Sequence, residues 1–196
     1  MKIAVYGATG MIGREVVTEA RNRGHEVSGY SRSGGDGVTV ADLGDTETFR
    51  EVATGNDAVV IALSPDRTGG PHEPLLAAYD AVLAAAPATR VVPVVGAGSL
   101  EVDGVVLADN PGFPEAYLPE AVTMKKVLDK FRATDALDWT AVSPAPGIAP
   151  GERTGTYRTA TDTPAGEAIS SQDLAVAIVD ELENPQHRGE RFTAAS

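Results

Sequence analysis

The chain has 196 residues, 28 acidic against 16 basic side chains, and a formal net charge of −12. This length fits one domain, and the acidic balance argues against nucleic acid as a partner, because surfaces that bind phosphate backbones gather Lys and Arg. Without cysteine there is no disulfide and no thiolate ligand or nucleophile, and the three histidines match no metal-binding spacing, so no metal is expected. The apolar runs are shorter than the ~20 residues that span a bilayer, and the N-terminus has no signal-peptide core. We therefore expect a cytoplasmic protein with no membrane partner.

Short β-branched apolar segments alternate with amphipathic ones, a pattern typical of βαβ units that build a parallel sheet buried on both faces. Strands are predicted at residues 2–6, 25–30, 38–40, 57–63, 90–95, 139–142 and 191–194. Helices are predicted at residues 11–23, 46–54, 74–86, about 120–133, and from a capping box at 170–173 to residue 182.

This pattern predicts a single α/β domain over residues 1–196. We expect a doubly wound, mostly parallel Rossmann sheet of six or seven strands in the order 3-2-1-4-5-6, with helices on both faces. Such a core uses most of the chain, so the loops at 64–74, 96–119 and 143–168 are expected to form the substrate side.

A glycine-rich loop at residues 7–13 lies where the first strand should turn into the first helix. Gly7 permits the tight turn, Gly10 lets backbone N–H groups approach a pyrophosphate, and Gly13 lets the helix pack closely on the strand. The helix N-terminus adds a partial positive charge. The motif predicts a dinucleotide site that also includes the intervening residues Ala8, Thr9, Met11 and Ile12.

The end of the second predicted strand indicates which nicotinamide cofactor is preferred. A carboxylate there binds the ribose 2′-hydroxyl of NAD, whereas an arginine pairs with the 2′-phosphate of NADP. Here Ser31, Arg32 and Ser33 follow the strand, and the next carboxylate is Asp36. We therefore predict a preference for NADP(H) over NAD(H); the alternative is a solvated loop arginine.

Further cofactor contacts are expected where the other strands end. Asp42 could accept a hydrogen bond from the adenine amino group while Leu43 packs on its ring, although Asp42 could also serve only the turn, and Asp45 should cap the next helix. The remaining expected contacts follow strands four to six: Ala62, Leu63, Ser64, Gly96, Pro144 and Ala145.

With these landmarks, the chain resembles the atypical short-chain dehydrogenase/reductases of the NmrA-like, NAD(P)H-binding group, and in particular the small NADH-flavin reductase and flavin/biliverdin-reductase-like proteins. The resemblance covers essentially the whole chain. It is carried by the segments at 2–10, 24–32, 41–43 with 56–60, 113–115, 138–144, 151–158, 169–175 and 191–193. It implies a Rossmann fold, NAD(P)H binding and reduction of a flavin or another flat aromatic acceptor.

The usual catalytic pair of this superfamily, a tyrosine followed four residues later by a lysine on one helix face, is missing. Tyr117 has Ala121 at that spacing, and Lys125 lies eight residues on, which is ~12 Å of helical rise. Pro119 between them is expected to start a helix.

Four other side chains are candidates for the chemistry. Ser99 could bond a substrate carbonyl or the nicotinamide carboxamide, or only its own loop. Lys125 could reach the nicotinamide ribose. Tyr117 could line the pocket or donate a proton, and His72 could protonate product near neutral pH, although loop histidines are more often bystanders.

The absent pair favours a planar acceptor over a carbonyl, because a flavin accepts hydride directly and solvent can supply the proton, whereas an alkoxide needs a donor. The expected function is an NADPH-dependent reductase of FMN, FAD, riboflavin or a quinone. The alternative is a non-catalytic NADP(H) sensor of NmrA type, and a sugar-nucleotide epimerase is disfavoured because no substrate domain remains. The sequence leaves monomer and homodimer open.

Overall fold

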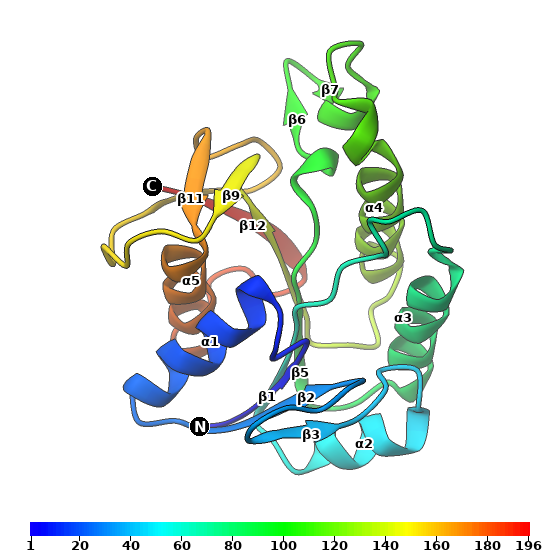
Figure 1. Cartoon of the computed structure of the whole chain (residues 1–196), viewed down its shortest axis with the longest axis vertical. Coiled ribbons are helices and arrows are strands. Elements are labelled where there is room, and N and C mark those ends of the chain that lie inside the picture. The colour runs from blue at the N-terminus through cyan, green and yellow to red at the C-terminus, as the bar shows by residue number, and fades with distance from the viewer.

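The computed structural model describes all 196 residues, and its centre is a parallel sheet in the order β3-β2-β1-β4-β5 (Figure 1). These strands are β1 (Lys2–Tyr6), β2 (Glu26–Ser31), β3 (Val38–Val40), β4 (Ala58–Ile61) and β5 (Arg90–Pro93). Parallel bridges from Val91 to Trp139 and from Val94 to Val142 continue the sheet to β8 (Thr140–Pro144), which pairs with β12 (Glu190–Ala195). The antiparallel β10 (Arg158–Ala160) forms the far edge. The predicted α/β fold and strand order are confirmed.

Five helices cover the two faces of this sheet. Helices α1 (Met11–Asn22) and α5 (Ser171–Glu183) pack on one face, whereas α2 (Thr46–Thr54), α3 (Glu73–Ala85) and α4 (Leu118–Arg132) lie on the other. None of them is long and apolar enough to cross a membrane. The predicted helix ends are accurate to within about two residues, and several of them carry specific caps. Gly24, at φ +83°, ends α1, and the Ser170 hydroxyl accepts the Asp173 N–H at 2.9 Å.

Alternation along the central strands divides the apolar core in two. Ile3 and Val5 point toward α1 and α5, whereas Ala4 and Tyr6 point toward α2, α3 and α4. Both sets are fully or almost fully buried, which is why the strands read as continuous apolar runs in the sequence.

The long segments expected to be loops contain short elements of their own. Residues 96–119 include the hairpin β6 (Glu101–Val102) and β7 (Val105–Val106), which turns at Asp103 and Gly104, both with positive φ. Residues 143–168 include β9 (Gly147–Ala149), which pairs in parallel with β11 (Ala168–Ser170). The hairpin and the β9–β11 pair rise on opposite sides of the upper part of the molecule in Figure 1.

A buried carboxylate joins α1, α5 and the segment after β9. Glu19, 4% exposed, accepts two bonds from Arg153 at 2.6 and 2.8 Å and one from Arg23 at 2.7 Å. Arg23 also reaches Asp180 of α5 at 2.6 Å. The bonds from Arg153 lower the pKa of Glu19 from 4.5 to about 2, against the opposing effect of burial and with further help from Arg23.

Replacing Glu19 with Gln should therefore lower the free energy of unfolding by about 1–3 kcal/mol at pH 7, because two guanidinium groups lose a charged acceptor. A pKa that is lowered in the folded state gives a stabilisation that is complete above pH 4.5 and is lost as the pH falls toward 2. Urea unfolding at several pH values should show the two proteins converging below pH 4.5. The exposed Glu51, replaced with Gln, is the control, and a difference independent of pH would contradict the assignment.

Candidate functional site

The parallel strands bring six loops to one edge of the sheet. Tyr6 is in register with Tyr30 and with Ile61, and Ile61 is in register with Pro93, so β1, β2, β4 and β5 end together. From β1 the chain adds β2 and β3 on one side and then crosses to add β4 and β5 on the other. The carboxyl ends of β1 and β4 therefore form the switch point, where open α/β sheets bind ligands.

At this switch point the glycine loop approaches the neighbouring backbone too closely for side chains. Gly7 has φ +81°, and a Cβ there would lie 2.3 Å from the Ala62 carbonyl oxygen. A Cβ on Gly13 would lie 2.1 Å from the Gly7 carbonyl oxygen. The Gly7 N–H donates to the Tyr30 carbonyl at 2.9 Å, which fixes the loop on β2. The expected mechanical roles of Gly7 and Gly13 match this geometry.

The first turn of α1 has an electrostatic arrangement suited to an anion. Its N-cap is Gly10, so no side chain caps the first N–H groups, and the turn contains no acidic residue. By contrast, α2 is capped by the Asp45 carboxylate, as predicted, through Thr48 N at 3.2 Å. Thr9 and Gly10 are exposed, while Met11 and Ile12 are half-buried. The N-terminus of α1, with its uncapped N–H groups and partial positive charge, can therefore bind a diphosphate.

Two glycines that the sequence analysis did not select bring the β2–β3 loop against the glycine loop. A Cβ on Gly29 would lie 2.8 Å from the Ala8 Cβ, and one on Gly35 would lie 3.5 Å from the Thr9 methyl carbon. A glycine inside a strand, as at Gly29, is itself a signal of close backbone approach. The residues after β2 are consequently neighbours of the expected pyrophosphate site.

Within this loop the three predicted phosphate ligands differ in availability. Ser31 is 8% exposed and donates its hydroxyl to the Gly34 carbonyl at 3.1 Å, so the expectation that this hydroxyl binds cofactor is not supported. Arg32 and Ser33 are exposed, and neither side chain has a hydrogen-bond partner within the chain. Arg32 is therefore the cation free to pair with a ligand.

The loop after β3 is also only partly available. The Asp42 carboxylate is exposed and uses one oxygen to accept the Gly44 N–H at 2.8 Å, as in an Asx turn. Leu43 is 2% exposed and belongs to the core that faces α2 and α3. Its side chain cannot cover the adenine ring as expected, because it packs inside the protein.

After β4, Ala62 and Leu63 are half-buried beside Gly7, and Ser64 is exposed. On the opposite flank Gly96 is half-buried, whereas Pro144 and Ala145 are buried at the end of β8. The backbone of the last two residues is the part that can face a cofactor.

Ser99 is committed to the protein interior. It is 5% exposed, accepts a bond from the Arg191 guanidinium at 2.8 Å and donates to the Gly96 carbonyl at 3.4 Å. Arg191 is itself buried and bonds Asp162; burial lowers its pKa more than this ion pair raises it. Of the two roles considered for Ser99, the structure favours the bond to its own loop over contact with substrate.

Lys125 is not placed at the nicotinamide side. The residue of α4 that faces Gly96 is Met124, whose Cβ would lie 3.4 Å from a Cβ on that glycine. Lys125 instead pairs with Asp129 at 2.8 Å, one turn further toward the C-terminus of α4 and away from the carboxyl edge. The predicted ribose contact from Lys125 is therefore not supported.

His72 is used to hold the β4–α3 loop. Its Nδ1 lies 2.7 Å from the Thr123 hydroxyl, and its Nε2 lies 2.8 Å from the Asp66 carbonyl. A carbonyl only accepts, so Nε2 carries the proton. Arg67 strengthens the same link with two bonds to Glu120 at 2.6 and 2.7 Å. His72 would have to break a bond to protonate a substrate, so this expectation is not supported.

Tyr117 is the remaining predicted catalytic residue. It is 60% exposed at the start of α4 and has no hydrogen-bond partner. It can thus contact a bound acceptor, but it has no lysine partner, because Lys125 of the same helix pairs with Asp129. Pro119 starts α4 as predicted.

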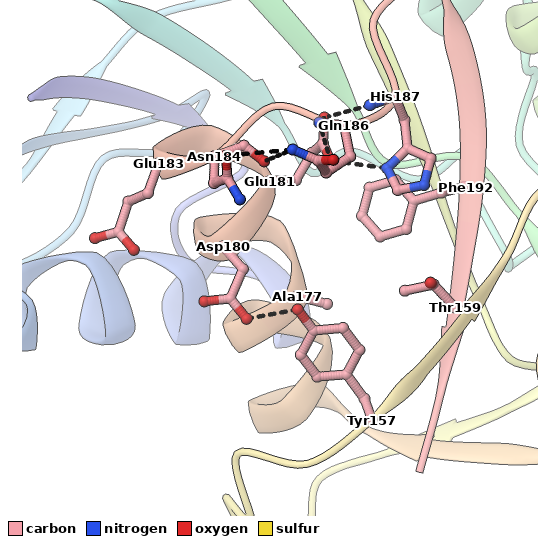
Figure 2. A pocket seen from close by; sticks show the side chains of 10 residues that line it. All are labelled: Tyr157, Thr159, Ala177, Asp180, Glu181, Glu183, Asn184, Gln186, His187 and Phe192. Atoms are coloured by element: carbon pink, nitrogen blue, oxygen red, sulfur yellow. Dashed lines mark hydrogen bonds and ion pairs between the residues drawn. The ribbon is translucent and has the colours of Figure 1, made fainter.

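A pocket of about 500 Å³ lies elsewhere, between the C-terminal end of α5 and the outer strands (Figure 2). Its carboxylates are occupied: Asp180 accepts from Tyr157 and Arg23, and Glu181 accepts from Arg90 and His187. The His187 ring stacks on Phe192 at 4.7 Å. Because these charges are satisfied and the pocket is remote from the glycine loop, we do not place the cofactor there.

Comparisons with known proteins identify the family of the chain. Residues 7–185 match the model of the NAD(P)H-binding family, and the chain belongs to this family. It is similar to the uncharacterized protein YwnB of Bacillus subtilis, with 38% identity over all of this chain and 99% of that protein.

Two solved structures are similar over nearly their whole length. One is described as a "putative NADH-flavin reductase" from Streptococcus pneumoniae, with 34% identity, a TM-score of 0.88 and coverage of 100% and 99% of the two chains. The other is described as a "putative epimerase" from Bacteroides thetaiotaomicron, with 35% identity, a TM-score of 0.85 and coverage of 99% and 96%.

The Gly13 contact predicts the result of a single substitution. Gly13→Ala places a methyl group 2.1 Å from the Gly7 carbonyl oxygen, so α1 must shift away from the phosphate position. We expect the Kd for NADPH, measured by calorimetry, to rise at least about tenfold, which corresponds to about 1.4 kcal/mol. Gly55→Ala is the control, because its nearest neighbour would be 3.5 Å away. Equal NADPH affinity in Gly13→Ala and wild type would exclude this geometry as the binding site.

Proposed function

We propose that the chain is an NADPH-preferring reductase that transfers hydride to a planar acceptor, either a flavin (FMN, FAD or riboflavin) or a quinone. One observation carries this proposal: none of the four predicted catalytic side chains is arranged as the usual proton donor. Ser99, Lys125 and His72 are bonded to other protein groups, and Tyr117 has no lysine partner. A carbonyl substrate would need such a donor, whereas a flavin does not.

The residues of the chain bind and orient the reactants. Bound NADPH supplies the hydride; the acceptor takes it up together with a proton from solvent and is reduced by two electrons, leaving NADP⁺. The glycine loop and the N-terminus of α1 hold the diphosphate, and Arg32 pairs with the 2′-phosphate. Asp42 bonds the adenine amino group, and backbone near Gly96, Pro144 and Ala145 borders the nicotinamide. Catalysis then rests on positioning.

The comparison proteins support a reductase without deciding the acceptor. The similar protein from Streptococcus pneumoniae carries a flavin-reductase description, which agrees with the missing proton donor. The similar protein from Bacteroides thetaiotaomicron carries an epimerase description, so the comparisons alone do not choose between the two reactions.

Arg32 provides the test of cofactor preference. Arg32→Ala should raise the Kd for NADPH roughly tenfold to a hundredfold, since bonds to charged groups contribute about 1.5–3 kcal/mol. The Kd for NADH should stay nearly unchanged, because NADH lacks the 2′-phosphate. Arg50→Ala, on the exposed side of α2, removes the same charge as a control. An unchanged ratio of NADPH to NADH affinity would exclude this role for Arg32.

Turnover provides the test of the reaction. NADPH is mixed with the protein and with riboflavin, FMN, FAD or a soluble quinone, and its oxidation is followed by absorbance. We expect oxidation that depends on both protein and acceptor, and we expect Tyr117→Phe to keep most of it because solvent supplies the proton. Tight NADPH binding without oxidation by any acceptor would instead indicate a non-catalytic NADP(H) sensor.

A further inference from the structure

The segment 96–119, which follows β5 at the carboxyl edge, has an unusual combination of side chains. It contains four carboxylates and neither Lys nor Arg. None of these carboxylates (Glu101, Asp103, Asp109, Glu115) forms an ion pair. None of them is therefore neutralised by a direct ion pair, although the buried Arg191, which bonds Ser99 of this segment, lies close enough to Glu101 to interact with its charge.

The same segment exposes much of the large apolar surface of the molecule. Of the seven large hydrophobic side chains that are exposed, four belong to it: Val102, Val105, Tyr117 and Leu118. Val102 and Val105 are cross-strand partners at the end of the hairpin, and Tyr117 and Leu118 begin α4. The segment thus offers apolar contact surface within a field of negative charge.

The other two segments at this side do not supply compensating positive charge. Together, segments 64–74, 96–119 and 143–168 carry nine acidic and three basic side chains. Two of the basic ones are engaged with carboxylates through paired bonds, Arg67 with Glu120 and Arg153 with Glu19. Arg158 is exposed on β10, at the far edge of the sheet.

We propose that the acceptor is a neutral planar molecule without a phosphate group, of the riboflavin or simple quinone class. This inference rests on the proposed function and specifies its substrate class. A phosphate ester carries nearly two negative charges at neutral pH, so acidic loops repel FMN. The ring system that FMN shares with riboflavin is uncharged and can pack on the apolar side chains. The cofactor differs in this respect, because its phosphates bind at the first turn of α1 and Arg32.

Riboflavin and FMN form a matched pair of probes, because they share the isoalloxazine ring and differ in the phosphate. With NADPH saturating, kcat/KM for riboflavin should exceed that for FMN roughly tenfold at low ionic strength. Added salt should raise the FMN value toward the riboflavin value, because it screens exposed charges over about 10 Å. Two results would overturn the inference and leave the proposed reductase activity intact. One is an equal kcat/KM for FMN and riboflavin; the other is a kcat/KM for FMN that falls with added salt while that for riboflavin does not.

Charge-neutralising variants locate the effect. The double variant Asp109→Asn, Glu115→Gln should raise kcat/KM for FMN several-fold and leave that for riboflavin unchanged. The control double variant Glu26→Gln, Glu190→Gln removes two exposed carboxylates at the amino ends of β2 and β12, away from the carboxyl edge. It should change neither value. An equal response to both double variants would also overturn the inference. No oxidation of NADPH by any acceptor would overturn the proposed function, and this inference with it.

Discussion

The fold depends on one backbone contact, the approach of the first turn of α1 to the turn that follows β1. At Gly13 and Gly7 the space that a Cβ would need is already occupied by main-chain atoms. This proximity places the start of α1 over the switch point of the sheet, with its N–H groups directed at the carboxyl edge. It also sets the position of the rest of α1, since a helix is stiff over three turns.

From that position α1 organises the other helix on its face. Glu19 and Arg23 lie about two and three turns beyond the glycine loop, where they join α5 and the segment carrying Arg153. The N-terminus of α5 holds the same segment through Asp173, which is 1% exposed and accepts the N–H groups of Thr154 and Gly155 at 2.8 Å. The arrangement that forms the proposed phosphate site therefore also fixes the long excursion between β8 and α5. A change in the glycine loop should be transmitted to this excursion through α1.

Much of the fold could be predicted because its signals are local. Continuous apolar segments such as 58–61 mark strands buried on both faces, and Ser170 and Gly24 mark helix ends by their capping chemistry. The strands between residues 147 and 170 were missed because each has three residues and lies among Pro, Gly and Thr. Their pairing depends on contacts distant in sequence, such as Ile148 with Ile169.

The candidate site was predictable to the extent that backbone geometry defines it. The roles of the glycines follow from spacing, whereas side-chain roles depend on which way each residue points. Lys125 and Met124 are adjacent, yet only Met124 faces Gly96, because successive helix residues are rotated by about 100°. Ser31 and Ser99 were chosen by position, but the nearest acceptors and donors belong to the protein. No pattern within the sequence reveals a partner such as Arg191, which lies 92 residues from Ser99.

The acidity of the chain and its affinity for a dinucleotide are compatible because the two charges are separated in space. Positive charge is available at the carboxyl edge, where a helix N-terminus without a side-chain cap lies beside a loop that carries the unpaired Arg32. The net charge of −12 is expressed elsewhere, notably in the segment after β5, which lacks any basic residue. A cofactor with several phosphates would then bind beside positive charge, and an acceptor without phosphate would bind beside the acidic segment without being repelled. The two parts of the carboxyl edge would then distinguish their ligands by charge before any specific contact is made.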